Sequence, residues 1–402
     1  MPSLTQSYQD FIQFIESRVE RKPYANNLAL RELAISCQKQ LSGESPLVWT
    51  RCTFPPELIA AFGALPVPFE IFTTVIGHLR QAPDYLLETE TMGFSTDSCS
   101  VVRIPLGGVL SDEDFPPPAM MIGITDFCED GMRFFEHLGR RHADREYILI
   151  EVPYTYNEET VNYVEGQLKD VVAALSQATG VPYNPDRLRK LIHSSNQVRK
   201  YRLKIAELKK SLPARYSGRH GADFFGLLER AVCGERAAEL AEQFYQEALS
   251  RADEPKTPEL TRLMWLYAFP PVPNVIEVLE NKWGAKVVAA EEEDAICWDE
   301  MDEREPLRAI ARRICQSRTV GAIDNRLRQI LRMAREYSVD GAIHFSHFSC
   351  AYSAGGTRVI KDTLAEEGVA FLNLDGDCAS MQNNNPAQMM EALEEFVERL
   401  ID

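Results

Sequence analysis

The sequence predicts an α/β protein with parallel sheets, and three observations lead to this prediction. First, residues 119–125 and 147–152 are continuous apolar runs, which are typical of strands buried on both faces. Second, residues 129–142 between them have the apolar spacing of a helix, which completes a βαβ unit. Third, strand-like and helix-like segments alternate along the C-terminal part of the chain. At 402 residues the chain is long enough for two or three domains.

The first half of the chain is expected to be mostly helical outside the βαβ unit. Apolar side chains recur at helical spacing in the first forty residues. A proline pair at 55–56 suits the start of a further helix, and residues 67–72 are expected to form a strand. Residues 157–250 have a helical pattern, in which Asn184 and Pro185 form a strong helix start.

The second half is expected to be a second α/β series. Its strands are expected at 262–268, 285–290, 341–346 and 369–374. Its helices are expected at 273–282, 305–316, 325–337, 356–367 and 386–400.

These patterns predict two Rossmann-like or flavodoxin-like parallel-sheet domains with an additional helical region. The expected segments are an N-terminal helical segment at 1–50, a first α/β domain at 51–156, a helical region at 157–254 and a second α/β domain at 255–402.

The charge and hydropathy of the chain exclude several classes of partner. The net charge is −17, which argues against nucleic-acid binding, because that affinity comes mostly from Lys and Arg at phosphates. No apolar run approaches the roughly 18 residues needed to span a membrane. The N-terminus also lacks the pattern of a signal peptide. A cytoplasmic location without membrane or nucleic-acid contact is therefore expected.

The nine cysteines are the main candidates for chemistry. The chain has no CxxC pair, HExxH motif or phosphate-binding GxxxxGK loop, so any metal ligands must come from separate segments. Ligands of open parallel sheets bind at the carboxyl ends of strands. Cysteines at or near expected strand ends or loops are Cys52, Cys99, Cys128, Cys350 and Cys378, of which Cys99 is expected in an irregular stretch between a strand and a helix.

Three interpretations of these cysteines stay open from spacing alone. Thiolates from separate loops suit an iron–sulfur cluster. A catalytic thiol at Cys350 would need a nearby base, for which His347 and then His344 are the candidates. The thiols can also be ordinary buried side chains, as expected for those on helical stripes, namely Cys37, Cys233 and Cys315. Cys297 fits either reading.

Several segments resemble, in the same order, landmarks of the 2-hydroxyacyl-CoA dehydratase and benzoyl-CoA reductase family. The resemblance runs along nearly the whole chain. The segments are FPPELIAAFGALPV, CSVVRIPLGGVL, PPPAMMIGITDFCEDGMRFFEHL, EPLRAIARRI, AREYSVDGAIHFSHFSC and LDGDCASMQNNNPAQMMEALEEFVE.

The resemblance implies a 4Fe–4S cluster held by Cys99, Cys128 and Cys350, with one iron left open. Cys52 matches a position where some members also carry cysteine, and it is a reserve ligand. Cys297 and Cys315 do not match the extra cysteines of the double-cubane members, which argues against that subtype.

The activity that the resemblance implies is that of the iron–sulfur subunit of an (R)-2-hydroxyacyl-CoA dehydratase. In the family, one electron from an ATP-dependent iron–sulfur activator protein converts the thioester of an acyl-CoA substrate into a ketyl radical that loses water. The chain would act as a heterodimer with a homologous second subunit. The alternatives are a subunit of an ATP-dependent benzoyl-CoA (aryl-CoA) reductase, a clusterless scaffold subunit and a cysteine hydrolase.

Polar residues beside Cys350 are candidates for direct roles. Ser349 and Ser346 are expected either to hydrogen-bond the substrate or the leaving hydroxide, or to cap the following turn. His347 is expected either to carry a proton near neutral pH or to be a hydrogen-bonded structural histidine.

Overall fold

The computed structural model describes residues 2–112, 114–252, 257–295 and 298–401. The chain divides into two compact units. Unit 1 contains Met1–Arg199, Leu227–Ala241 and Trp298–Gly321, and unit 2 contains Lys200–Gly226, Glu242–Cys297 and Ala322–Asp402. The expected boundaries near residues 51, 157 and 255 stay a prediction.

The sheet of unit 1 is fully parallel and has the strand order β2-β1-β3-β4. Its strands are β1 (Leu47–Thr50), β2 (Leu65–Pro68), β3 (Met120–Ile124) and β4 (Glu146–Ile150). The expected strands at 119–125 and 147–152 are confirmed as β3 and β4. The central strand β1 was not predicted, since a run of four residues gives little periodic signal.

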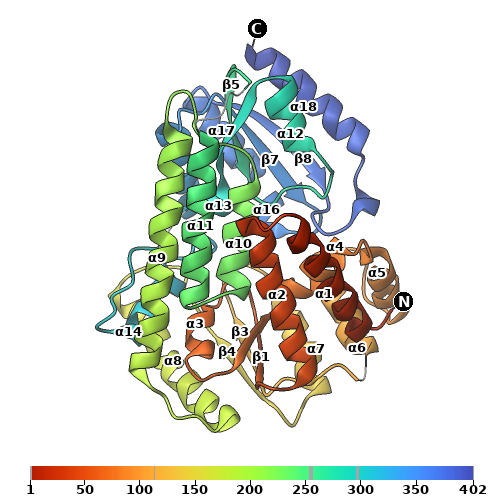
Figure 1. Cartoon of the computed structure of the whole chain (residues 1–402), viewed down its shortest axis with the longest axis vertical. Coiled ribbons are helices and arrows are strands. Elements are labelled where there is room, and N and C mark those ends of the chain that lie inside the picture. The colour runs from red at the N-terminus through yellow and green to blue at the C-terminus, as the bar shows by residue number, and fades with distance from the viewer. Residues whose placement is uncertain (1, 113, 253–256, 296–297, 402) are drawn as a thin grey trace. The chain divides into compact units, whose positions relative to one another are not determined.

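Helices surround this sheet, and two expectations about them need correction. The helices are α1 (Leu4–Arg21), α2 (Ala25–Ser42), α3 (Pro56–Ala60), α4 (Glu70–His78), α5 (Ala82–Thr91), α6 (Ser100–Ser111), α7 (Glu129–Arg141), α8 (Glu158–Thr179) and α14 (Pro306–Cys315). The first forty residues form two helices that pack side by side, because Pro23 interrupts the backbone hydrogen bonds (Figure 1). The expected strand at 67–72 is wrong beyond Pro68. There Phe72 and Ile76 instead lie one turn apart on the buried face of α4.

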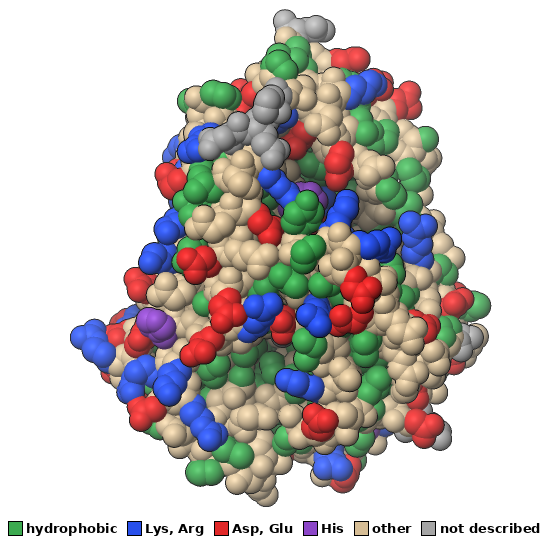
Figure 2. All heavy atoms as spheres, viewed as in Figure 1, with side chains coloured by type: hydrophobic (Ala, Val, Ile, Leu, Met, Phe, Trp, Pro, Cys, Tyr) green, Lys and Arg blue, Asp and Glu red, His purple; other side chains and the backbone are tan. Residues whose placement is uncertain are grey.

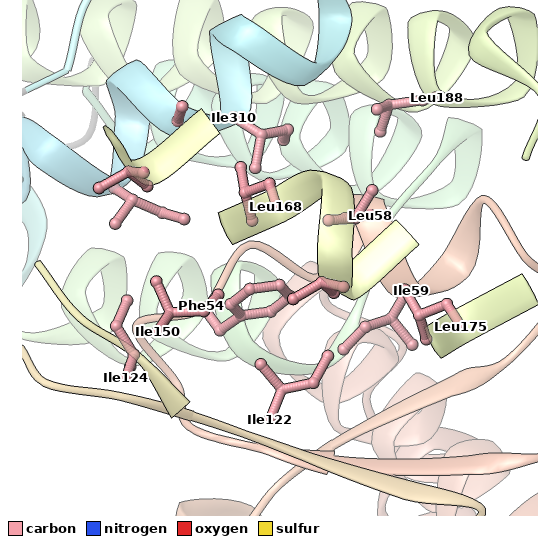
Figure 3. Close-up of a cluster of buried hydrophobic side chains, with 14 of the residues drawn as sticks. Phe54, Leu58, Ile59, Ile122, Ile124, Ile150, Leu168, Leu175, Leu188 and Ile310 are labelled. Atoms are coloured by element: carbon pink, nitrogen blue, oxygen red, sulfur yellow. The ribbon is translucent and has the colours of Figure 1, made fainter. Parts of the chain in front are cut away.

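The core of unit 1 joins segments that are far apart in the sequence. Phe54 and Ile122 meet Leu168 of α8 and Ile310 of α14 in one buried apolar cluster (Figure 3). Helix α14 packs on α8, which explains why residues 298–321 belong to this unit. Each fully buried large apolar side chain contributes about 1.5–3 kcal/mol to folding.

The sheet of unit 2 is also fully parallel, with the order β6-β5-β7-β8. Its strands β5 (Thr261–Leu266), β6 (Ala285–Ala290), β7 (Gly341–His347) and β8 (Ala370–Gly376) confirm the four expected strands. Its helices are α12 (Val275–Lys282), α13 (Glu291–Asp294), α15 (Ile323–Glu336), α16 (Ala351–Ala354), α17 (Thr357–Glu366) and α18 (Pro386–Ile401), with a short 3₁₀ turn at Met381–Asn383.

Both faces of this second sheet are covered. One apolar cluster joins the sheet to α12 and α18, and a second cluster joins it to α15 and α17. In Figure 1, α12 and α18 lie side by side in the blue-green and blue part of the chain. Helices on both faces of a parallel sheet define a doubly wound α/β architecture, so the predicted fold class is confirmed.

Three further helices form the region that was expected to be helical. They are α9 (Pro185–Lys210), α10 (His220–Ala231) and α11 (Glu235–Ala252), and each has residues in both units. The predicted start at Asn184 is confirmed, since its side chain accepts the backbone N–H of Asp186 at 2.9 Å.

Charged side chains of both signs lie on the surface. On the face drawn in Figure 2, Lys and Arg side chains lie interspersed among Asp and Glu. Among the described residues, no helix is both long and apolar enough to cross a bilayer.

Candidate functional site

The carboxyl edge of the unit 1 sheet gathers cysteines. Cys52 follows β1, and Cys128 follows β3 as the N-cap residue of α7. Cys99 is the N-cap residue of α6, and its backbone N–H donates to Asp130 Oδ2 at 2.9 Å. Asp130 lies in the first turn of α7, so this contact ties the start of α6 to the start of α7. Unit 1 therefore brings together the two helix starts that carry Cys99 and Cys128.

The sulfur of Cys128 lies in a setting that suits a metal thiolate. Its Sγ accepts the backbone N–H of Gly131 at 3.3 Å. The exposed N–H groups at a helix start carry partial positive charge, which favours an anionic sulfur. Hydrogen bonds from the protein to ligating sulfurs are a usual feature of iron–sulfur sites.

A buried arginine supplies positive charge at the same edge. Arg51 is 1% exposed, and its Nη1 donates to Asp126 Oδ1 at 2.6 Å. Burial acts to lower the pKa of Arg51, but the negative charges around it, from Asp126 first and then Cys128, outweigh burial and raise that pKa. The guanidinium therefore stays charged beside the cysteines. A Cβ at Gly131 would lie 2.9 Å from Arg51 Cζ, so this approach requires glycine.

Cys52 differs from the other two cysteines of this edge. Burial raises the pKa of its thiol well above the ordinary value, and the charge of Glu70 raises it further. Its backbone N–H donates to Glu70 Oε2 at 3.0 Å. These contacts favour a protonated thiol, and the reserve-ligand role of Cys52 stays a prediction.

The carboxyl edge of the unit 2 sheet carries Cys350. This residue follows β7 and is the N-cap residue of α16. Its Sγ lies 3.4 Å from the hydroxyl oxygen of Tyr267, which follows β5. Cys378, after β8, is a second thiol at this edge. Burial raises the pKa of Cys378 well above the ordinary value, with further contributions from Asp377 and Cys350, so that it remains a thiol.

The two predicted catalytic residues have different surroundings. The side chain of His347 is buried, and its Nδ1 accepts the backbone N–H of Cys378 at 3.2 Å. Burial lowers the pKa of His347, although Asp377 opposes this shift. Because Nδ1 accepts the backbone N–H of Cys378, the neutral form of the imidazole carries its proton on Nε2. Ser349 is exposed and has a left-handed backbone (φ 63°). The catalytic roles of both residues stay a prediction.

The capping role considered for the serines is wrong, because Cys350 occupies the N-cap position of α16. Ser346 Oγ instead donates to Asn373 Oδ1 on the neighbouring strand at 2.7 Å. The turn after β7 is closed by Ser353, whose Oγ accepts the backbone N–H of His347 at 3.0 Å.

The remaining cysteines partly match expectation. Cys37 and Cys315 are buried on helices, as predicted. Cys233 was expected on a helix but follows the end of α10, and Cys99 follows a helix rather than a strand, because residues 82–91 form α5. Cys297 lies outside the described residues.

Within the described parts of the chain, no three His, Cys, Asp or Glu side chains are grouped as ligands of one metal ion. The ligand set Cys99, Cys128 and Cys350 stays a prediction.

Several residues of these edges were not identified from the sequence. Arg51 follows the unpredicted strand β1, and Tyr267 was placed inside the expected strand 262–268, which ends at Leu266. A lone arginine directly after the four residues Leu47–Thr50 is too weak a signal to identify a site.

Two parallel sheets, each with cysteines near its carboxyl edge, define a class of α/β protein in which ligands bind at that edge. Residues 51–400 match the family model described as 2-hydroxyglutaryl-CoA dehydratase, D-component. The chain belongs to this family, which confirms the predicted family and, at the family level, the predicted enzyme subunit.

Similar proteins include subunits of three named enzymes. The chain is 24% identical to the alpha subunit of the (R)-phenyllactyl-CoA dehydratase of Clostridium sporogenes, over 85% of this chain and 86% of that protein. It is 21% identical to the alpha subunit of the lactoyl-CoA dehydratase of Anaerotignum propionicum, over 88% and 90%. It is 23% identical to one subunit of the benzoyl-CoA reductase of Thauera aromatica, over 80% of each chain.

Proposed function

We propose that this chain is the iron–sulfur subunit of a cytoplasmic (R)-2-hydroxyacyl-CoA dehydratase, with a 4Fe–4S cluster held by Cys99, Cys128 and Cys350. The observation that carries the proposal is that each of these cysteines is the N-cap residue of a helix. Of the cysteines described, Cys37, Cys52 and Cys315 have no such position. Family membership and the names of the similar dehydratase subunits support the same reaction.

The settings of Cys128 and Cys350, each taken by itself, support a thiolate-bound cluster. When bound, the cluster supplies single low-potential electrons for the acyl-CoA thioester. A cluster with thiolate ligands is anionic, and the buried guanidinium of Arg51 would balance part of that charge. The backbone N–H of Gly131 would hold the Cys128 sulfur in place. His347, at the end of β7, is the proposed proton carrier near Cys350.

The proposal includes partners that supply the electron and complete the enzyme. The similar proteins are each named as one subunit of a larger enzyme, which supports a homologous second subunit in a heterodimer. An ATP-dependent iron–sulfur activator protein would deliver the electron, as the resemblance to the family implies, and the lack of a GxxxxGK loop in this sequence agrees with ATP being bound by another protein. The substrate would be a 2-hydroxyacyl-CoA ester.

Iron and sulfide analysis after purification without air, together with the second subunit, tests the ligand set. We expect each of the variants Cys99→Ala, Cys128→Ala and Cys350→Ala to lose iron from this chain. Each variant is also expected to stop forming enoyl-CoA in the presence of the reduced activator. Cys315→Ala is the matched control, because Cys315 is a buried thiol at the last position of α14 and is not the N-cap residue of a helix. Undiminished iron in all three variants would contradict the proposal, and a wild-type chain without iron would favour a clusterless scaffold.

A second candidate is a subunit of an ATP-dependent aryl-CoA reductase. The similarity to a benzoyl-CoA reductase subunit favours it. The two candidates differ in product. A dehydratase forms an enoyl-CoA from a 2-hydroxyacyl-CoA without net reduction, whereas a reductase forms a dienoyl-CoA from an aryl-CoA with two electrons consumed.

A further inference from the structure

The phenol of Tyr267 is a polar side chain that reaches the sulfur of Cys350. Its hydroxyl oxygen lies 3.4 Å from Cys350 Sγ, and both residues are partly buried in unit 2. A cysteine that binds metal is a thiolate and has no proton to give. In that state the Tyr267 hydroxyl must be the donor of this hydrogen bond.

The backbone of Tyr267 is held in an unusual conformation. Its φ of 66° lies in the left-handed region, which an aromatic residue rarely adopts. Ser349, directly before Cys350, is left-handed as well (φ 63°). Such strain persists only where the surroundings enforce it, and it is concentrated at functional sites. One strained residue is Tyr267, whose phenol contacts the sulfur. The other is Ser349, which directly precedes the cysteine that carries the sulfur.

A buried ion pair enforces this geometry. The backbone N–H of Tyr267 donates to Glu291 Oε2 at 2.8 Å. The Glu291 carboxylate in turn forms a two-point contact with Arg326, with distances of 2.7 and 2.8 Å. Both side chains of the pair are about 2% exposed. The ion pair therefore holds Tyr267 through its backbone N–H, while the Tyr267 phenol contacts the Cys350 sulfur.

The same arginine also holds the helix that begins at Cys350. Arg326 Nη1 donates to the backbone carbonyl of Tyr352 at 2.9 Å, and its Cζ lies 4.5 Å from the centre of the Tyr352 ring. Tyr352 belongs to α16, of which Cys350 is the N-cap residue. One ion pair thus positions both the donor residue and the sulfur.

We propose that the Tyr267 hydroxyl donates a hydrogen bond to the Cys350 sulfur and raises the reduction potential of the bound cluster. Glu291 and Arg326 are the positioning residues for this contact. A donor to a ligating sulfur stabilises the more negative, reduced cluster, and this raises its potential. The inference rests on the proposed function in one respect, namely that Cys350 ligates the cluster.

The test is a redox titration of the enzyme with its second subunit, followed by electron paramagnetic resonance, for wild type, Tyr267→Phe and Tyr352→Phe. Tyr352→Phe is the matched control, since its hydroxyl lies 3.4 Å from Glu291 Oε1, on the ion pair and not on the sulfur. Tyr267→Phe is expected to keep its iron and to be about tenfold harder to reduce, which is a potential about 59 mV more negative for one electron. Tyr352→Phe is expected to keep the wild-type potential.

An unchanged potential in Tyr267→Phe with full iron would overturn the inference and leave the proposed function standing. Loss of iron from Tyr267→Phe, but not from Tyr352→Phe, would also overturn it, because the hydroxyl would then serve assembly. A wild-type chain without iron would instead overturn the proposed function. If Tyr267→Phe does not fold, Tyr267→Asn takes its place, since asparagine tolerates the left-handed backbone, and the same shift is expected.

Discussion

Both sheets carry cysteines at their carboxyl edges, but the two edges surround the sulfur atoms with different groups. In unit 1, the buried cation Arg51 influences the cysteines directly, and a backbone N–H contacts the Cys128 sulfur. In unit 2, a neutral phenol contacts the Cys350 sulfur, and the cation Arg326 acts through Glu291.

This difference separates two ways to stabilise an anionic sulfur. A nearby cation stabilises it at any orientation, but the cation must itself be balanced by buried carboxylates such as Asp126. A phenol carries no charge to balance, but it must be held at the correct distance and angle. Unit 1 therefore depends on charge balance, and unit 2 depends on positioning.

The largest effect is expected from removal of the unit 1 cation. Arg51→Met would leave Asp126 buried without its cation, and the free energy of unfolding is expected to fall by about 3–5 kcal/mol. Arg133→Met is the control, because Arg133 is exposed and pairs with Asp130 at the surface, where less than about 1 kcal/mol is expected. Urea denaturation measures the loss of stability in both variants. Equal losses would show that the buried pair of Arg51 and Asp126 stabilises unit 1 no more than a surface pair does.

A similar or slightly smaller loss is expected in unit 2 from Arg326→Met. This change leaves the single carboxylate of Glu291 buried, and a loss of about 3–4 kcal/mol is expected. The control is Arg335→Met on the same helix, since Arg335 pairs with Glu367 at the surface. A loss no larger than that of the control would show that the buried pair is not needed for positioning.

A pH dependence is expected from a second buried cluster of unit 2, in which Lys209 pairs with both Glu293 and Asp294. Burial raises the pKa of Glu293 to about 7, against the opposing charge of Lys209. The folded chain then holds a proton that the unfolded chain releases above about pH 4.5, so stability falls as pH rises from about 4.5 to about 7 and is level above 7.

Above pH 7 the free energy of unfolding is expected to be about 3 kcal/mol lower than below pH 4.5. Glu293→Gln removes this pH dependence, because glutamine does not titrate, and Lys209 keeps Asp294 as its partner. Urea denaturation of wild type and variant from pH 5 to 8 measures the difference, and parallel curves would refute the prediction.

The smallest effect tests the approach of Arg51 to helix α7. Gly131→Ala places a Cβ 2.9 Å from the guanidinium, and a loss of about 1–3 kcal/mol is expected. Gly139→Ala on the same helix meets no atom within 4 Å, and a gain of up to about 1 kcal/mol is expected from helix propensity. Thermal unfolding compares the two variants, and the same sign for both would contradict the close approach.

Local sequence patterns were enough to predict the fold class and most elements. Strand β3 is an apolar run long enough to stand out, and Asn184 with Pro185 marks a helix start regardless of context. Strand β1 has four residues and no such signal, so Arg51, which follows it, was missed as well. Tyr267 was placed inside a strand because an aromatic residue after an apolar run continues the strand pattern, and only the left-handed backbone ends it there.

The order of strands and helices, and the occurrence of cysteines near strand ends, follow from residues that are neighbours in the chain. The groups around those sulfurs do not, because they come from contacts between distant segments. Arg51 meets Gly131, and Glu291 meets Arg326, only once each sheet has formed and its strand ends lie side by side. Burial then changes the charge and hydrogen bonding of these side chains, and no local pattern encodes burial by a remote segment.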